Sequence, residues 1–346
     1  MSALIRTLPA SWYYDPAIYE RERKGIFSKE WLYVAEEREF QKPRDFKVTE
    51  IAGFPLLLVV DENREIRAFH NFCRHRGAPL LTEGRGCLKA SSLSCRYHGW
   101  TYDLKGALIQ APQWECPSLN GVDVSLLPIQ VATLNGLVFI NLDRSARPFA
   151  EFFGPIQKEI ARSGYPMQEY ETFSSMVKEG DFNWKVWVDG YQECYHCTTI
   201  HPIFNKDFQL RKYKVENKDG YAVHSCERKA QSEMGGFQGL WLWVSPNLGF
   251  PFYEPCYYTL QVNPLGPTRT RLSYSFRFRP SSSEESRNEF VEVIRRITME
   301  DVAICEQVQK NLAAGVFEEG FLNPDRESGV EYFQNIVRRA VLSQAP

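Results

Sequence analysis

Hydrophobic and polar positions change their spacing twice along the chain. Between about residues 15 and 38, apolar side chains recur at helical intervals among charged ones, which predicts a helix near the N-terminus. From about residue 44 to 145, short apolar runs alternate with Gly, Pro and Asn turns, as expected for strands and hairpins. After Arg147-Pro148 the pattern is mixed and predicts helices over 149–163, 184–199, 284–314 and 328–343, with strands over 222–226, 240–244, 257–262 and 269–279.

These segments predict an α+β protein with three parts. Residues 1–43 would form a helical segment that packs on the last domain, and residues 44–146 a small all-β domain. Residues 147–346 would form an α+β domain built on an antiparallel sheet. A length of 346 residues agrees with about two domains.

Composition and charge exclude several classes of protein. A hydrophobic fraction of 43% and a charged fraction of 24% are typical of a globular chain. The net charge of −2 gives no electrostatic reason to expect nucleic acid or an anionic membrane as a partner. No apolar run has the length of a membrane span, and the first residues lack the apolar core of a signal peptide. We therefore expect a soluble, cytoplasmic protein.

Two cysteines of the predicted all-β domain lie close to histidines in the sequence. The nine cysteines are too few for a disulfide scaffold, and their odd number favours metal binding or buried thiols. The sequence contains Cys73-x-His75 and, further along, Cys95-x-x-His98, each in a Gly-bearing loop of the predicted all-β domain. Such pairs could hold a zinc ion, or a [2Fe–2S] cluster in which two His replace two Cys on one iron. Because each pair mixes the two ligand types, the cluster is favoured over zinc and over unrelated buried side chains.

A second constellation contains His196 and His201. Five residues turn an α-helix through about 500°, so these two would not share a face of one regular helix. Pro202 disfavours the helical conformation at His201, so the helix should end near Thr199 and let His201 turn back toward His196. Two imidazoles and one carboxylate make the facial triad of non-haem Fe(II) oxygenases.

The carboxylate is expected from the helix predicted near residue 300. Asp301 stands on an apolar stripe that runs through Phe290, Ile294, Ile297, Ile304, Val308 and Leu312. A carboxylate on a buried stripe needs a cation or strong hydrogen-bond donors, and a metal would supply this. The alternative is an Asp at the edge of the stripe that pairs with an Arg.

These motifs resemble those of the terminal (alpha) component of Rieske-type non-haem iron oxygenases. Cys73-Arg74-His75 with Cys95-Arg96-Tyr97-His98 is similar to the family's Rieske motif, with the longer gap interpreted as a lengthened hairpin over 84–94. Its catalytic pattern is similar to Asn183-Trp184-Lys185, then Glu193-x-x-His196-x4-His201-Pro202, then Glu300-Asp301 with Gln309. The resemblance covers nearly the whole chain. It implies a Rieske domain inserted before a helix-grip-like catalytic domain with an antiparallel sheet flanked by helices.

The resemblance also implies the roles of individual residues. Cys73, His75, Cys95 and His98 would bind the [2Fe–2S] cluster, His196, His201 and Asp301 a mononuclear Fe(II), and Glu193 and Asn183 would be catalytic. In the family, a carboxylate at the position of Glu193, usually Asp, bridges an iron histidine to a Rieske histidine of the neighbouring subunit. Glu at this place, within Glu193-Cys194-Tyr195-His196-Cys197, resembles the branch that oxidises choline, betaine and carnitine.

Aromatic residues could form a substrate pocket. A quaternary ammonium has no hydrogen to donate, so proteins bind it with aromatic faces through cation–π attraction. Trp241 and Trp243 would lie on one face of a strand, and we predict that they form the pocket with Tyr191 and Asn247. The alternative for each ring is packing between the sheet and its helices.

The resemblance implies a monooxygenase that uses O2 and electrons from NAD(P)H. Since no Gly-x-Gly-x-x-Gly fingerprint follows a predicted strand, a separate reductase would deliver the electrons. The family's head-to-tail rings imply a homotrimer or a multiple of it. Two alternatives are the same mechanism on an aromatic or natural-product substrate, and a Rieske electron carrier without oxygenase activity. The second histidine pair and Asp301 argue against the carrier.

Overall fold

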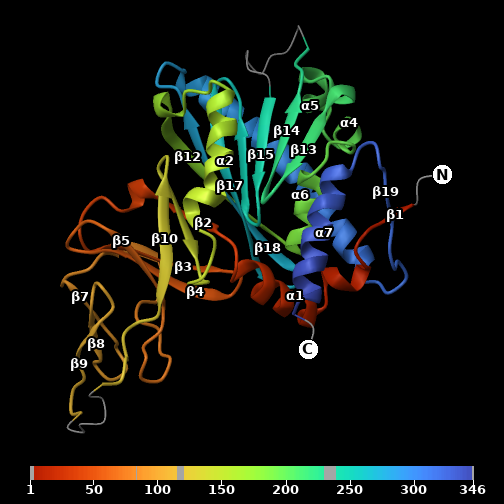
Figure 1. Ribbon diagram of the computed structural model, residues 1–346. Helices are drawn as coiled ribbons and strands as arrows, with labels where there is room; N and C mark the ends of the chain where they lie inside the picture. The colour runs from red at the N-terminus through yellow and green to blue at the C-terminus, as the bar shows by residue number, and fades with distance from the viewer. Residues whose placement is uncertain (1–3, 83, 115–120, 230–238, 345–346) are drawn as a thin grey trace. The chain divides into compact units, whose positions relative to one another are not determined.

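The computed structural model describes residues 4–82, 84–114, 121–229 and 239–344, and the chain forms two compact units (Figure 1). One unit comprises residues 29–146, and the other comprises residues 1–28 together with 147–346. The division therefore lies near residue 28, whereas the sequence predicted a boundary at residue 43. No helix of the described residues is long and apolar enough to cross a bilayer.

The division lies earlier because the predicted N-terminal helix is short. It contains α1, Pro16–Glu22, and the π-helical turn η2, Arg23–Phe27. Asp15 caps α1 by accepting a hydrogen bond from the N–H of Ala17. The apolar run that follows forms strand β2, Leu32–Glu36, which is buried at every position and pairs with β11, Leu137–Asn141. Burial on both faces makes this run a strand of the 29–146 unit, although its spacing also suits a helix.

Two antiparallel sheets form the 29–146 unit, as the alternating sequence predicted. The larger sheet has the order β2-β11-β10-β5-β4-β3-β6, and the smaller has the order β7-β8-β9. The further strands are β3 Asp45–Ile51, β4 Phe54–Val60, β5 Ile66–His70, β6 Gly84–Cys87, β7 Ser92–Ser94, β8 Thr101–Asp103, β9 Leu108–Gln110 and β10 Pro128–Leu134. A short 3-10 turn, η3, spans Glu37–Glu39.

The segment 84–94 is not the single hairpin that the sequence predicted. Strand β6 pairs with β3 at the edge of the larger sheet, whereas β7 pairs with β8 in the smaller one. The longer gap between the ligand pairs thus adds an edge strand. Side chains from both sheets, among them Leu57, Phe69 and Leu93, share one core with Cys73 and Cys95.

The other unit is built on an antiparallel sheet of seven described strands, in the order β12-β18-β17-β16-β15-β14-β13. These strands are β12 Glu171–Gly180, β13 Lys214–Lys218, β14 Tyr221–Cys226, β15 Gly239–Val244, β16 Leu248–Phe252, β17 Cys256–Gly266 and β18 Arg269–Phe278. The helices are α2 Phe149–Arg162, α3 Trp184–Tyr191, α4 Cys197–Ile200, α5 Pro202–Asp207, α6 Glu284–Leu312 and α7 Ser328–Leu342. Strands β1 Ile5–Arg6 and β19 Phe321–Leu322 pair with each other, and 3-10 turns η1, η5 and η6 span Ala10–Tyr13, Met167–Glu169 and Leu210–Lys212.

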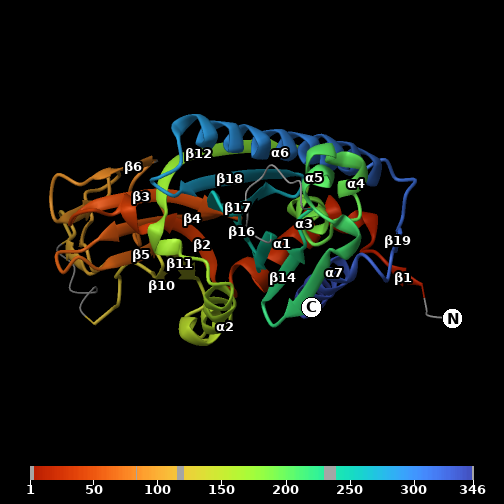
Figure 2. The ribbon, with the colours of Figure 1, turned by 90° about the horizontal axis from the view of Figure 1, so that it is seen from above.

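Helix α6 lies along one face of this sheet (Figure 2) and carries Asp301. Its buried positions differ from the predicted stripe: they are Phe290, Val291, Ile294, Thr298, Val302, Cys305, Gln309 and Leu312. Thr298 and Gln309 are polar but bonded, to the Tyr274 hydroxyl at 3.0 Å and to the Tyr13 carbonyl at 3.1 Å. An apolar pattern cannot reveal such positions, so the predicted stripe passed through Ile304 and Val308 instead. Asp301 consequently lies at the edge of the buried face.

A buried ion pair holds the N-terminal segment to α3. Glu22 and Lys185 are both fully buried, with 2.6 Å between Oε1 and Nζ. Trp184 donates its indole N–H to Glu22 at 2.8 Å. Asn183 caps α3 and accepts a hydrogen bond from the Lys185 ammonium at 2.8 Å. The Asn183-Trp184-Lys185 motif therefore fastens α1 to the helix that leads to His196.

Candidate metal centres and their cavities

Cys73 and Cys95 occupy equivalent places in two loops of the same form. In each loop, the cysteine N–H donates to the carbonyl five residues later, at 2.7 and 2.8 Å. Gly77 and Gly99, four residues after each cysteine, donate back to the cysteine carbonyl at 2.9 Å. Both glycines have a φ of 74°, a conformation that glycine adopts without strain. One turn is therefore repeated, and each copy leaves its sulfur in the core.

The histidines of the two loops face each other. The rings of His75 and His98 lie 4.6 Å apart, and His75 stacks on Trp100 at 5.0 Å. Nε2 of His98 lies 3.0 Å from the Arg76 guanidinium, which leaves Nδ1 as its free ring nitrogen. Nδ1 of His75 is buried, and no hydrogen-bond partner for it is found among the residues that the structure describes. A buried nitrogen without a partner costs free energy, and a metal bond would satisfy it.

The sulfurs also fit a metal. Both cysteines are 2% exposed, and the Tyr102 hydroxyl lies 3.3 Å from the sulfur of Cys73. Burial raises the pKa of the Cys73 thiol, so it stays protonated at neutral pH unless a cation binds. Two inward sulfurs and two facing imidazoles match the donor set of a [2Fe–2S] cluster with mixed ligation.

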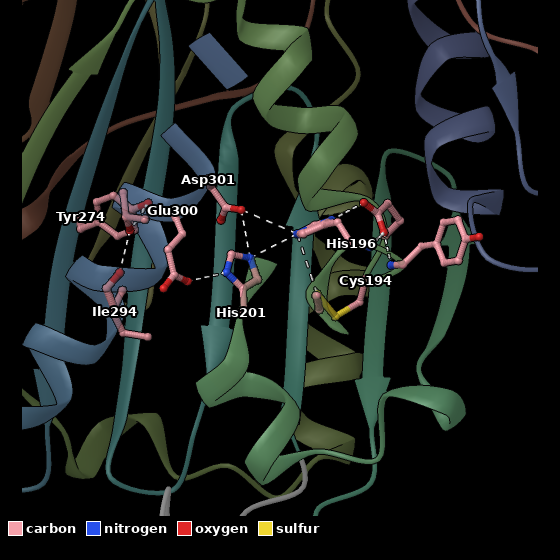
Figure 3. A network of polar contacts seen from close by, with 11 residues as sticks. Cys194, His196, His201, Tyr274, Ile294, Glu300 and Asp301 are labelled. Carbon is pink, nitrogen blue, oxygen red and sulfur yellow. Dashed lines mark hydrogen bonds and ion pairs between the residues drawn. A yellow bond between two sulfur atoms is a disulfide. The ribbon is translucent and has the colours of Figure 1, made fainter. Parts of the chain in front are cut away.

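In the other unit, Figure 3 shows three donor atoms that converge on one point. Nε2 of His196 lies 3.2 Å from Nε2 of His201, and Oδ1 of Asp301 lies 3.6 and 3.0 Å from these two atoms. Bonds of about 2.1 Å to one octahedral metal would place neighbouring donors about 3 Å apart. The three donors therefore fit a facial site with its other positions open.

The chain breaks its helix to bring the histidines together. The helix predicted over 184–199 is interrupted: α3 ends at Tyr191 and α4 begins at Cys197. His201 has φ −116° and ψ 81°, outside the helical region, and Pro202 begins α5. The turn before Pro202 is thus present as predicted, and it points His201 back toward His196.

A carboxylate bonds to Nδ1 of each imidazole, the ring nitrogen that faces away from the centre. The Glu193 carboxylate bonds to Nδ1 of His196, and Glu300 bonds to Nδ1 of His201 at 2.8 Å. Because Nδ1 donates to a carboxylate, Nε2 keeps its lone pair toward the centre. Burial lowers the pKa of both histidines, but the neighbouring carboxylates outweigh burial and raise each pKa above its ordinary value. Metal binding would therefore release protons from this site.

Two further residues at the site had no role in the sequence prediction. Glu300 is one: the catalytic pattern contained it beside Asp301, but gave it no role. Asp189 is the other, one helical turn before Glu193, and its Oδ2 accepts a hydrogen bond from the Tyr13 hydroxyl at 2.6 Å. Burial raises the pKa of Asp189 to about 7.

A disulfide joins Cys194 and Cys197 on either side of His196. The sequence predicted metal ligands or thiols, but the Cα atoms are 5.0 Å apart, well within disulfide range. Cys197 is also near both histidines, with its sulfur 3.9 Å from Nε2 of His196. A disulfide sulfur is not a thiolate, so Asp301 is the better third donor.

Asn183 has structural contacts instead of a place at the metal site. Its side chain accepts hydrogen bonds from the N–H and the ammonium of Lys185, and donates to the Pro267 carbonyl at 2.6 Å. Its backbone N–H donates to Gln309 at 2.8 Å. These bonds occupy the amide, so the catalytic role predicted for Asn183 has no support in the geometry.

Two cavities reach the converging donors: His196, His201 and Asp301 line one, and only His196 and Asp301 of the three line the other. The smaller has a volume of about 110 Å³ and an aromatic wall, and the larger has about 340 Å³ and a mostly apolar lining. Glu193, His196 and Asp301 line both. Of the predicted pocket residues, Tyr191 and Trp241 line the smaller cavity.

The other two predicted pocket residues lie elsewhere. Trp243 and Asn247 are buried, and neither is among the described residues that line the two cavities. The Trp243 ring packs against Tyr191 at 5.3 Å. The packing alternative therefore describes Trp243 better than the pocket does.

Comparison with protein families matches both units. The family described as "Rieske [2Fe-2S] domain" matches residues 30–131, and "Ring hydroxylating alpha subunit (catalytic domain)" matches residues 167–343. The carnitine monooxygenase oxygenase subunit of Acinetobacter pittii is 28% identical over 96% of this chain and 94% of its own length. The chloroplastic choline monooxygenase of Amaranthus tricolor is 26% identical over 94% of this chain and 76% of its own.

Solved structures agree with these relatives. The quaternary ammonium Rieske monooxygenase CntA in complex with L-carnitine superposes with a TM-score of 0.81 at 26% identity, covering 97% of this chain and 96% of that one. Naphthalene 1,2-dioxygenase from Rhodococcus sp. superposes with a TM-score of 0.79 at 19% identity, covering 98% and 95%. At that identity the likeness shows the fold alone.

Proposed function

The chain belongs to the family of ring hydroxylating alpha subunits with a Rieske domain, and on that premise we propose that it oxidises a quaternary ammonium compound. It is an oxygenase whose cofactors are a Rieske [2Fe–2S] cluster and a mononuclear non-haem iron. The observation that carries the proposed substrate is the aromatic-walled cavity that opens onto His196 and Asp301. Relatives named for carnitine and choline support it.

The donor atoms assign the ligands of the two cofactors. Cys73 and Cys95 would hold one iron of the cluster, and Nδ1 of His75 and of His98 the other. His196, His201 and Asp301 would hold the mononuclear iron. The bound iron supplies O2 activation: with two electrons and two protons, one oxygen atom enters a substrate C–H bond and the other becomes water.

The surrounding residues position the ligands and the substrate. Glu193 and Glu300 fix the imidazole planes, so that both Nε2 atoms point at one place. The aromatic wall would bind the cationic head through cation–π attraction and hold a neighbouring C–H bond beside the iron.

A separate reductase is the proposed electron donor. The sequence has no Gly-x-Gly-x-x-Gly fingerprint for a dinucleotide, and its motifs account for a single cluster. Electrons from NAD(P)H would therefore reach the cluster from another protein. Steady NADH oxidation by the purified chain alone would contradict this.

We propose that the chain assembles head to tail into a ring, a trimer or a multiple of it. Exposed aromatic side chains accompany each centre: Tyr97 and Trp114 near the Rieske histidines, and Tyr195 beside Glu193. Such surfaces suit a closing heterologous interface, in which His98 of one subunit meets Glu193 of the next. Light scattering that finds an active monomer would contradict the ring.

The test of the proposed function is turnover by the complete system. The chain, loaded with both metals, would be mixed with a suitable reductase, NADH and O2, and offered choline, glycine betaine, L-carnitine and an aromatic acid. Hydroxylation of a carbon bonded to nitrogen leads to loss of the amine and frees an aldehyde. Hydroxylation of the carbon that bears the hydroxyl group gives a hydrate that loses water to an aldehyde still carrying the ammonium. In both cases we expect aldehyde formation coupled to NADH use. Oxidation of the aromatic acid, with none of the cations consumed, would favour the alternative substrate class.

A further inference from the structure

The larger cavity has a mostly aliphatic wall. It lies between α3, the second half of α6, β19 and α7, beside the residues that precede α1. Ile304, Val308 and Leu312 line it at one-turn spacing along α6, so they form a strip that leads away from Asp301. Aliphatic side chains of the other elements complete the wall: Leu8, Val186, Leu322 and Val330. Such a wall favours an aliphatic ligand group over a polar one.

Most of the polar side chains in this lining already bond within the protein. The Tyr13 hydroxyl donates to Asp189 at 2.6 Å and accepts a hydrogen bond from the Gln334 amide at 3.1 Å. The same Gln334 side chain accepts a hydrogen bond from the backbone N–H of Leu8 at 2.8 Å. These bonds join the N-terminal segment, α3 and α7 around the cavity. A ligand in the cavity would therefore gain chiefly from the aliphatic surface that it covers.

The two cavities differ in size as well as in lining. The larger has about 340 Å³, and the aromatic one has about 110 Å³. An apolar cavity of about 150 Å³ is large enough to bind benzene, so the aromatic cavity suits a compact head group and the larger one suits a chain. The rim of the larger cavity reaches the surface at Ile304, Val308 and Phe317, which are 37%, 38% and 46% exposed. A chain could therefore enter from solvent.

The two cavities join beside the metal ligands. Six residues line both: Trp187, Gly190, Tyr191, Glu193, His196 and Asp301. Gly190 lies in the last turn of α3, where glycine is less favourable than alanine. A Cβ added to Gly190 would meet no atom of the described residues within 4 Å. The missing side chain therefore leaves open space where the two cavities meet.

Resting on the proposed function, we propose that the substrate is an amphiphilic quaternary ammonium compound. Its cationic head lies against the aromatic rings of the smaller cavity, and a medium-length aliphatic chain extends past Gly190 into the larger cavity. The carbons that join the head to the chain then lie beside His196 and Asp301, which line both cavities. Burial of the chain adds affinity that a small cation lacks.

The first experiment measures binding to the anaerobic holoenzyme by calorimetry. The probes are tetramethylammonium and the trimethylammonium ions that carry a butyl, hexyl, octyl or decyl chain, each kept below its micelle concentration. Octan-1-ol is the uncharged control. Affinity should rise about two- to fourfold for each added methylene, and level off once the chain fills the cavity.

The outcomes of this series separate the inference from the proposed function. An affinity that did not depend on chain length would overturn the inference and leave the proposed function intact. If octan-1-ol bound as tightly as octyltrimethylammonium, the cationic head would contribute nothing, and the proposed function itself would fail. It would fail equally if none of the ammonium ions bound.

The second experiment closes the junction with Gly190→Leu. The added side chain should weaken octyltrimethylammonium binding at least about tenfold, because the chain loses its apolar surroundings, and should leave tetramethylammonium unchanged. Gly154→Leu is the matched control: Gly154 also lies in a helix with open space around it, but it lines neither cavity. Unchanged octyl binding in Gly190→Leu, or equal losses for both ions, would overturn the passage between the cavities.

The third experiment tests the wall without altering α3. Ile304→Gln places an amide on the aliphatic strip at a partly exposed position, where the fold should tolerate it. It should weaken decyltrimethylammonium binding about three- to tenfold and leave tetramethylammonium unchanged. Met299→Gln, on the same helix but outside both linings, should change neither. Equal effects of the two substitutions on the decyl ion would overturn the inference, and the cluster absorption spectrum confirms that each variant is folded.

Discussion

The two metal centres of this chain are assembled in opposite ways. In the 29–146 unit, each pair of proposed ligands lies within one short loop, and backbone hydrogen bonds that close on Gly77 and Gly99 shape that loop. In the other unit, His196 and His201 come from a break between helices, and Asp301 comes from α6, far along the sequence. The first centre depends on local turns, and the second depends on how distant elements pack.

The supporting contacts differ in the same way. The Rieske loops hold their cysteines with main-chain groups, which any sequence of the right turn type supplies. The mononuclear site is oriented by the side chains of Glu193, from the break between α3 and α4, and of Glu300, from α6. Mutations remote from a centre should therefore disturb the mononuclear site more than the cluster.

The largest expected effect is the loss of all turnover when either centre is removed. Cys73→Ser should abolish the cluster signal in electron paramagnetic resonance and leave the mononuclear site able to bind iron. Asp301→Ala should abolish turnover and keep the cluster signal, because it removes one of three donors. Iron analysis with the two spectra checks both variants. If either substitution emptied both centres, the two sites would not be independent.

The next largest effect concerns the remote support of the mononuclear site. Lys185→Met leaves Glu22 buried without its cation and should lower the free energy of unfolding by about 3–5 kcal/mol. The double variant with Glu22→Gln keeps an acceptor for Trp184 and should recover most of the loss. Urea unfolding measured by tryptophan fluorescence gives the values. If the cluster signal were lost at the same urea concentration at which the catalytic unit unfolds, the two centres would not differ in their dependence on remote contacts.

This contrast explains how much of the molecule the sequence could predict. Cys73-x-His75 and Cys95-x-x-His98 were identifiable because spacing alone sets a local loop. The boundary at residue 43 was wrong because burial of β2 depends on its partner β11, which no local pattern reveals. Buried polar positions such as Thr298 and Gln309 hid the true face of α6 for the same reason.

The candidate mononuclear site could be predicted only in part from the sequence, because it depends on the packing of distant elements. Pro202 indicated the break that turns His201. Asp301 lies beside both histidines, although the stripe from which it was proposed was misplaced. The bond of Glu300 to His201 was not predicted because it depends on how α6 packs against the turn before Pro202. Trp243 shares a face of β15 with Trp241, but the Tyr191 ring packs on Trp243. Alternation along the strand could not distinguish the tryptophan that lines the cavity from the one that packs in the core.

A smaller effect should separate the two supporting carboxylates. Both bond to an imidazole, but only Glu193 is proposed to reach a Rieske histidine of the neighbouring subunit. Glu193→Gln should therefore cut turnover about 10- to 100-fold with both metals bound, while Glu300→Gln should chiefly weaken iron binding. Glu193→Asp should cost less than Glu193→Gln. The measurement is turnover per bound iron in each variant. Equal losses for Glu193→Gln and Glu300→Gln would contradict the proposed bridge from Glu193 to the Rieske histidine of the neighbouring subunit.

The smallest effect is a pH dependence that belongs to the catalytic unit. His224 on β14 is fully buried against Tyr191 and Tyr213, and burial lowers its pKa to about 3. The unfolded chain has the ordinary value near 6.5, so the folded state binds fewer protons and loses stability as pH falls from about 6.5 toward 3. At pH 5 the loss is about 2 kcal/mol, and His224→Gln should not show it. Urea unfolding of both proteins at pH 7.5 and pH 5 isolates the difference from all shared carboxylates. Parallel losses in the two proteins would mean that acid acts at other groups of the chain and not at His224.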